Sequence, residues 1–152
     1  MRMRNGEKTM KARHFLILAP AMILLMPRAS QGEISIGYAM DVIHALGTDA
    51  IVTRYDHRES RLGLQAMYWN GPDHSNGSLG VDYDLIPSET WDLNLGGAYL
   101  ARVNTVNGTH FNFSAGLGIN IGSRFRVQFT HMSNAHSNNN NGWNFVGFLL
   151  RF

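Results

Sequence analysis

Two side chains near the end of the sequence have the chemistry and the spacing of a nucleophile and its base. His131 and Ser133 are separated by a single residue. In an extended strand, residues two apart share a face with backbones roughly 6.5–7 Å apart, so an imidazole can lean onto a hydroxyl. A serine hydroxyl is a poor nucleophile until an adjacent base takes its proton. If this segment is a strand, the spacing predicts a serine–histidine pair.

The residues around the pair, like most of the chain after Gly32, alternate between apolar and polar side chains. In the clearest stretch, 111–121, apolar residues occupy one parity from Phe111 to Ile121 and small or polar residues occupy the other. A period of two is typical of a β-strand with two different faces. We expect eight strands, at roughly 34–42, 50–55, 61–70, 79–85, 90–102, 109–121, 124–133 and 144–152.

The connections between these strands alternate in length. Those expected at 43–49, 71–78, 103–108 and 134–143 are longer than those at 56–60, 86–89 and 122–123. Outer-membrane barrels have even strand numbers from eight upward, long outer loops and short periplasmic turns. The expected fold is therefore all-β, an eight-stranded antiparallel transmembrane β-barrel. The alternative is a soluble secreted β-sandwich or lipocalin-like fold, whose apolar face would point inward.

Residues 1–32 are expected to be an export signal that precedes a barrel domain at 33–152. Five Lys and Arg residues come before an apolar run, Phe15–Met26, and small and polar residues follow as far as Gly32. This order is typical of a secretory signal peptide, and the apolar run is short for a permanent membrane helix. Cleavage is expected after Ala29 or Gly32. The alternative is a retained, membrane-anchored helix.

Removal of the signal changes what the charge implies. The full chain has 13 basic and 11 acidic residues, of which seven basic residues, all arginine, and ten acidic residues follow it. The pI of about 9.2 therefore reflects the export signal, and no nucleic-acid partner is expected. The chain has no cysteine, which excludes disulfides and thiolate metal sites. Four histidines in or next to expected loops lack metal-ligand spacing, so no metal or other cofactor is expected: His44, His57, His74 and His110.

In a barrel this narrow, the small and polar face is expected to line the lumen and the apolar face to contact lipid. The acidic residues expected in the lumen, offset by Arg126 and Arg151, are Asp41, Asp82, Asp84 and Asp92. Residues expected to point outward include Phe113, Leu117, Val127 and Phe148. Candidates for the aromatic girdles at the two membrane interfaces are Tyr38, Tyr68, Tyr83, Trp91, Tyr99 and Phe152.

The serine–histidine pair lies at the end of a lipid-facing row. Phe125, Val127 and Phe129 set this parity, and His131 and Ser133 continue it. An ionisable residue facing lipid is by default a functional hypothesis. The alternative is that the strand has reached the headgroup level, where a histidine costs little. With both termini periplasmic, this strand runs outward and the pair lies at the outer leaflet, where lipid A is found.

At this point the sequence resembles a known family, the lipid A 3-O-deacylases of the PagL type. The resemblance is strongest over 129–142, read as FTHMSNAHSNNNNG, which matches the family's H-x-S-N-A string and its N-x-G loop. It extends more loosely through the glycine-rich strands to the C-terminus. The resemblance implies that Ser133 is the nucleophile and His131 the general base. It also implies that Asn134 and Asn140 contribute to an oxyanion hole.

One departure from the family concerns the residue that orients the histidine. The family has a glutamate two residues after the loop glycine, where this chain has Asn144. An asparagine can still accept a hydrogen bond from a histidine and hold its tautomer, although it supplies no charge. Asn144 shares the outward parity of Val146 and Phe148, so we expect it to face His131 across the strand pair, with its amide oxygen on a ring nitrogen.

The resemblance implies an outer-membrane enzyme that hydrolyses the ester-linked 3-hydroxyacyl chain at the 3-position of lipid A, without a metal. The expected partners are lipid A or lipopolysaccharide in the outer leaflet, the membrane itself and a second copy of the chain in a possible homodimer. One alternative is a non-catalytic small barrel of a structural or adhesive kind. Another is a related barrel that has lost activity through the change from glutamate to asparagine.

Overall fold

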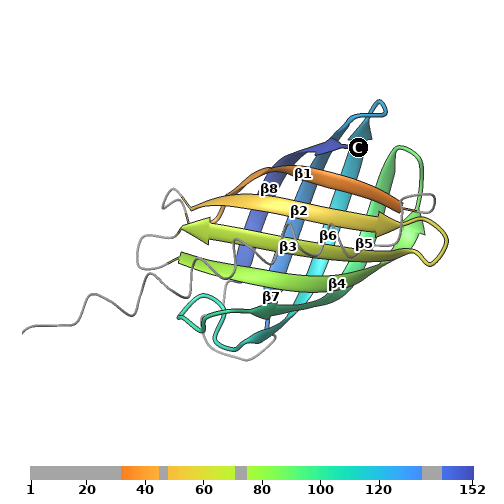
Figure 1. Cartoon of the computed structure of the whole chain (residues 1–152). Coiled ribbons are helices and arrows are strands. Elements are labelled where there is room, and N and C mark those ends of the chain that lie inside the picture. The colour runs from red at the N-terminus through yellow and green to blue at the C-terminus, as the bar shows by residue number, and fades with distance from the viewer. Residues whose placement is uncertain (1–31, 45–47, 71–74, 135–141) are drawn as a thin grey trace, which may run out of the picture. The chain divides into compact units, whose positions relative to one another are not determined.

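The computed structural model describes residues 32–44, 48–70, 75–134 and 142–152. The expected signal peptide falls almost entirely outside these ranges and stays a prediction. The described chain forms eight strands: β1 (Gly32–Asp41), β2 (Asp49–His57), β3 (Leu62–Asn70), β4 (Ser75–Pro87), β5 (Trp91–Leu100), β6 (Phe111–Ile121), β7 (Phe125–Ser133) and β8 (Trp143–Arg151). Each strand pairs antiparallel with the next, and β8 pairs with β1 to close a barrel (Figure 1).

The fold predicted from the alternation is confirmed, and most strand bounds differ by one or two residues. The largest difference is β4, which begins at Ser75 instead of 79. Asn76-Gly77-Ser78 has the composition of a turn, and its interpretation as one was wrong. The Asn76 side chain is buried, accepts from Arg102 N at 2.9 Å and donates to Arg102 O at 3.0 Å. The connection 71–74 is consequently no longer than the turn 58–61, against the expected alternation.

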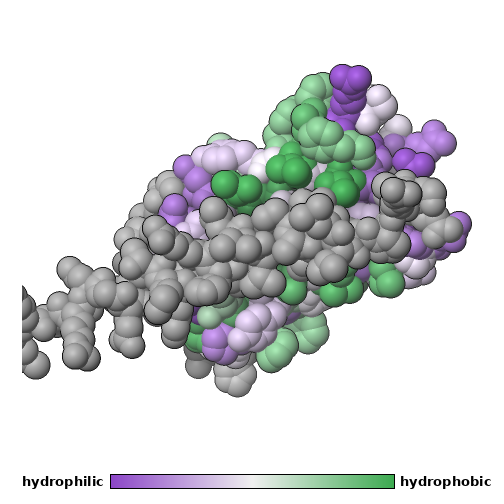
Figure 2. Space-filling view, viewed as in Figure 1, coloured by the Kyte–Doolittle hydropathy of each residue, from purple (hydrophilic) through white to green (hydrophobic). Residues whose placement is uncertain are grey.

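The outside of the barrel is apolar. Phe113, Leu117 and Phe148 are 69%, 39% and 53% exposed, and Val127 shares their outward parity, as expected. Figure 2 shows hydrophobic side chains gathered on the barrel wall. No helix in the described ranges is long and apolar enough to cross a membrane. Hydrocarbon offers no hydrogen-bond partners, and a closed barrel needs none because its backbone groups pair between strands. A continuous apolar wall, in turn, needs lipid to cover it. The chain is a membrane-spanning barrel.

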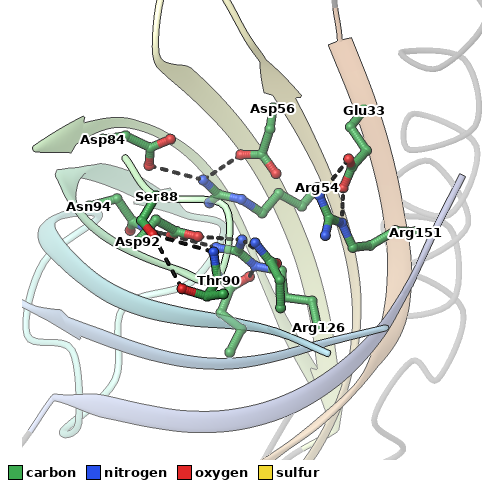
Figure 3. Close-up of polar contacts among 12 residues, drawn as sticks. Glu33, Arg54, Asp56, Asp84, Ser88, Thr90, Asp92, Asn94, Arg126 and Arg151 are labelled. Atoms are coloured by element: carbon green, nitrogen blue, oxygen red, sulfur yellow. Dashed lines mark hydrogen bonds and ion pairs between the residues drawn. The ribbon is translucent and has the colours of Figure 1, made fainter. Parts of the chain in front are cut away.

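One half of the lumen is crossed by ion pairs. Arg54 is 1% exposed and makes a two-pronged contact with Asp82, at 2.8 Å for each bond. Arg126 makes a two-pronged contact with Asp92, at 2.6 and 2.7 Å (Figure 3). The pairing with Arg126 was expected. Arg54 was not assigned a role, and Arg151 pairs with Glu33 instead of the lumen aspartates. A charge in this low-dielectric interior must be paired, because an isolated one is expensive.

The other half of the lumen is aromatic, which corrects the expectation of a uniformly small and polar lining. Trp69, Trp143 and Phe145 are at most 4% exposed, with ring centroids 5.3 to 5.8 Å apart. Between the two halves, a cavity lined by Gln65, Gln128 and neighbouring residues measures only ≈ 10 Å³. That volume holds about one water molecule. The side chains of the two halves therefore leave only a small gap at this level of the described lumen.

The lumen ion pairs generate a stability prediction. Arg126→Met leaves Asp92 charged and unpaired in the interior, and breaking a buried pair on one side costs about 3–5 kcal/mol. We expect a lower midpoint of urea unfolding in lipid vesicles, with most of the loss recovered when Asp92→Leu is added.

Arg58→Met is the matched control, because the Arg58 side chain is 73% exposed and lies 3.7 Å from Glu33. Its effect should stay within about 0.5 kcal/mol. If Arg126→Met and Arg58→Met lower the free energy of unfolding equally, the buried ion pair contributes nothing specific to stability.

Candidate active site

His131 and Ser133 are the last two outward-facing residues of β7. The parity of β7 places Phe125 and Phe129 on the exposed face and Arg126, Gln128 and Thr130 inside. His131 and Ser133 continue the outward row, and both are half-buried. The strand position expected for the pair is therefore confirmed: both side chains lie on the lipid-facing wall, at the end of the barrel opposite residues 32 and 152.

Asn144 faces His131 from the neighbouring strand. The register of β7 and β8 pairs the two residues directly, and His131 Nδ1 lies 2.8 Å from Asn144 Oδ1. Asn144 is only 4% exposed although it has the outward parity of β8. This hydrogen bond is the contact expected from the shared parity. The part it plays in any reaction stays a prediction.

The orientation of the Asn144 amide determines which ring nitrogen of His131 carries the proton. Asn144 Nδ2 donates to Gly142 O at 3.1 Å, so the amide oxygen is the atom turned toward the histidine. An amide oxygen only accepts, hence Nδ1 of His131 must be the donor. In the neutral ring, Nε2 is then left with its lone pair. Asn144 thus holds His131 in the tautomer that a general base at Nε2 requires.

Gly142 holds this arrangement together from the start of β8, and sequence analysis assigned it no role. Its φ of +62° lies in the left-handed region, which favours glycine. A Cβ at this position would lie 2.5 Å from Met132 O and 3.0 Å from both His131 Cε1 and Ser133 Cβ. Only a glycine can bring its carbonyl group to Asn144 while lying against both members of the pair. The N-x-G pattern of the loop is the signal that marked it.

The Ser133 hydroxyl and the His131 ring share a face and are not hydrogen-bonded to each other. Within the described residues, the structure has no hydrogen bond between them. Catalytic hydrogen bonds are often long in the absence of substrate and shorten when it binds. The structure therefore brings together His131, Asn144 and Gly142 through hydrogen bonds, and places Ser133 beside them on the same wall.

The two residues expected in an oxyanion hole have different outcomes. Asn134 is half-buried directly after β7, and its Nδ2 donates to Asn107 O at 2.9 Å. Its amide is thus fixed by the connection between β5 and β6. Asn140 lies outside the described residues. The oxyanion role of both stays a prediction.

The surroundings of the pair are apolar and exposed. On β6, Phe113 lies opposite Ser133 and Ala115 lies opposite His131. On β8, Val146 follows Asn144 on the outward face and is 38% exposed. A molecule that reaches Ser133 along this wall approaches through the hydrocarbon or the interfacial layer, since His131 and Ser133 face away from the lumen.

A second serine–histidine contact provides a useful comparison. Ser60 Oγ lies 3.0 Å from His57 Nδ1 in the turn after β2, at the other end of the barrel. The same nitrogen accepts from Ser60 N at 3.1 Å, so this histidine caps a turn. No described residue orients its other nitrogen. No group of metal-ligating side chains occurs in the described residues either.

Comparisons with known proteins identify similar folds and no relative. No family model and no curated protein matches the chain. The solved structures similar to it include a de novo designed transmembrane β-barrel, with 11% identity, a TM-score of 0.49, and coverage of 83% of this chain and 98% of the other. They also include the outer membrane protein Ail of Yersinia pestis, with 17% identity, a TM-score of 0.46, and coverage of 80% and 99%. At these levels neither similarity indicates an activity.

The amide orientation generates a spectroscopic prediction. In protein labelled with ¹⁵N at histidine and folded in micelles, long-range ¹H–¹⁵N spectra should show neutral His131 protonated at Nδ1. Asn144→Ala removes the acceptor at Nδ1 and should shift the population toward the Nε2-protonated tautomer. Asn112→Ala, which removes a buried amide on the lumen-facing side of β6, should leave the His131 signals in place. A wild-type His131 protonated at Nε2 would contradict the arrangement.

Proposed function

We propose that the protein is a lipid A 3-O-deacylase of the bacterial outer membrane. It would hydrolyse the ester-linked 3-hydroxyacyl chain at the 3-position of lipid A, with Ser133 as nucleophile and His131 as general base. The observation that carries the proposal is the hydrogen bond from His131 Nδ1 to Asn144 Oδ1, made on the lipid-facing wall next to Ser133. A histidine at headgroup level with no catalytic task needs no such fixed tautomer.

The proposed reaction follows the general serine hydrolase route. His131 Nε2 takes the proton of Ser133 Oγ as the oxygen bonds to the ester carbonyl carbon. The carbonyl electron pair moves to oxygen and forms the tetrahedral oxyanion. When the oxyanion collapses, the bond to the sugar oxygen breaks and the imidazolium protonates that oxygen. Water then attacks the acyl-serine by the same route, which releases the 3-hydroxy fatty acid and restores Ser133.

The position of the pair supports a lipid substrate. An ester of lipid A lies close to the headgroup, while its acyl chains extend into the hydrocarbon. If both termini are periplasmic, β7 ends at the outer leaflet, where lipopolysaccharide resides. A substrate that diffuses in the membrane plane can then bring its ester to Ser133 laterally, with its chains against the apolar wall around Phe113 and Val146. A water-soluble ester has no comparable route.

Asn144 contributes orientation without charge. In a triad with a carboxylate, the negative group also stabilises the imidazolium that forms in the transition state. An amide oxygen provides the hydrogen bond alone, and charge-assisted hydrogen bonds are roughly twice as strong as neutral ones. The proposed enzyme should therefore be active and slower than a counterpart with a carboxylate at this position.

Mass spectrometry of lipid A from cells with and without the protein tests the proposal directly. Wild-type protein should remove one 3-hydroxyacyl chain, and Ser133→Ala or His131→Asn should reduce this loss to the limit of detection. Both side chains lie outside the packed lumen, so heat-modifiable gel mobility should remain that of a folded barrel.

Ser60→Ala is the matched control, because it removes a serine hydroxyl from the other serine–histidine contact. It should deacylate at the wild-type rate. If folded wild-type protein leaves lipid A intact, the barrel is non-catalytic, of a structural or adhesive kind. Activity that survives in Ser133→Ala would exclude Ser133 as the nucleophile.

Changes at Asn144 should alter the deacylation rate in opposite directions. Asn144→Ala loses a hydrogen bond to a ring that becomes charged, worth about 1.5–3 kcal/mol, so the rate should fall by about 10- to 100-fold. That loss should be smaller than the loss from Ser133→Ala. Asn144→Glu adds charge assistance and should raise the rate by about tenfold. If neither change affects an enzyme that still requires His131, another group must orient the ring.

A further inference from the structure

The connection 101–110 between β5 and β6 is folded around buried asparagine side chains. Asn107 is 0% exposed, and its Nδ2 donates to Arg102 O at 3.0 Å and to Thr109 O at 2.7 Å. Asn76 on β4 donates to the same Arg102 O at 3.0 Å. Asn104 Oδ1 accepts from the backbone N–H groups of Val106 and Asn107, at 2.9 and 3.0 Å. Hydrogen bonds from side-chain amides thus take the place of backbone pairing in this connection. The bond from Asn76 attaches the connection to β4.

The same connection reaches across β6 to the end of β7. Asn107 O accepts from Asn134 Nδ2 at 2.9 Å, between residues 27 apart in sequence. Asn134 directly follows Ser133, the last residue of β7. A continuous set of hydrogen bonds therefore runs from Asn76 through Arg102 O and Asn107 to the residue after the candidate nucleophile.

Gly108 makes this contact possible. Its φ is +62°, and a Cβ at this position would lie 2.5 Å from Asn134 Nδ2. Glycine is therefore required both by the backbone conformation and by the neighbouring amide. Any side chain here must displace the Asn134 amide, unless the whole connection moves.

We propose that this connection positions Asn134 for the reaction at Ser133, with Asn107 and Gly108 as positioning residues that act through the Asn134 amide. The inference rests on the proposed deacylase function. A donor near a developing oxyanion stabilises it only when the donor is already in place before the reaction, and amides held by the protein meet that condition. The hydrogen bond to Asn107 O holds the Asn134 side chain in one orientation.

Kinetics of the full-length protein folded in micelles test the proposal, with lipid A as substrate. Removing a single oxyanion donor typically lowers kcat by about 10²–10³-fold, so we expect Asn134→Ala to lower kcat by an amount in that range. Gly108→Ala displaces the amide without removing it, and we expect kcat to fall about tenfold with KM changed less than about twofold. In the Asn134→Ala background, Gly108→Ala should change kcat by less than about twofold, because its target is gone.

Gly122→Ala provides the matched control. Gly122 has a φ of +63°, and a Cβ there would meet no atom within 4 Å. The Gly122→Ala variant therefore has the same unfavourable backbone conformation as Gly108→Ala but displaces no neighbouring atom. It should deacylate lipid A at the wild-type rate. If Gly108→Ala fails to give the folded gel mobility, Asn107→Asp replaces it, since that change removes both donations of Asn107 and should follow the same pattern.

The outcomes separate the two proposals. An inactive, folded wild type overturns the proposed function and the catalytic role of this connection together. An active wild type in which Gly108→Ala is as fast as Gly122→Ala overturns the role of the connection alone. If Gly108→Ala lowers kcat equally in the wild-type and Asn134→Ala backgrounds, the role of the connection is also overturned. The connection would then affect the barrel as a whole and not the Asn134 amide.

Discussion

The closed ladder of backbone hydrogen bonds is the constraint on which the rest of this structure depends. Hydrocarbon offers no partner for an exposed N–H or C=O group, so a sheet that spans it must have no free edge. The pairing of β8 with β1 provides this closure. Closure in turn gives every strand one face toward the lumen and one toward lipid. The position of each polar residue on one of these two faces then decides what that residue can do.

Residues on the inner face stabilise the barrel through ion pairs and aromatic packing. The Arg54–Asp82 and Arg126–Asp92 pairs cross one half of the lumen, and the aromatic cluster around Trp69 and Trp143 fills the other. The two cavities described in the lumen measure ≈ 10 Å³ each, about the size of one water molecule. The described polar contacts at the end of β7 lie on the outer wall, away from these cavities.

The candidate site depends on short-range geometry from three sources. β7 provides His131 and Ser133, β8 provides Asn144 opposite His131, and Gly142 brings the backbone close enough to lock the Asn144 amide. The connection between β5 and β6 adds a fourth contact through Asn107 and Asn134. The Asn144 and Asn134 amides each donate to a backbone carbonyl, Gly142 O and Asn107 O, and Asn144 in turn holds the His131 ring.

The sequence by itself determined the two-faced character of the strands, because alternation has a period of two whatever the partner strand. From it followed the number of strands, the outward direction of Phe113 and Phe148, and the shared wall of His131, Ser133 and Asn144. Tertiary structure alone decided which residues meet across strands. The pairing of Arg54 with Asp82, the contact of Trp69 with Trp143 and the contact of Asn134 with Asn107 join residues 27 or more positions apart. Such contacts depend on strand register and on the curvature of a closed sheet, and neither is encoded in the alternation of any single strand.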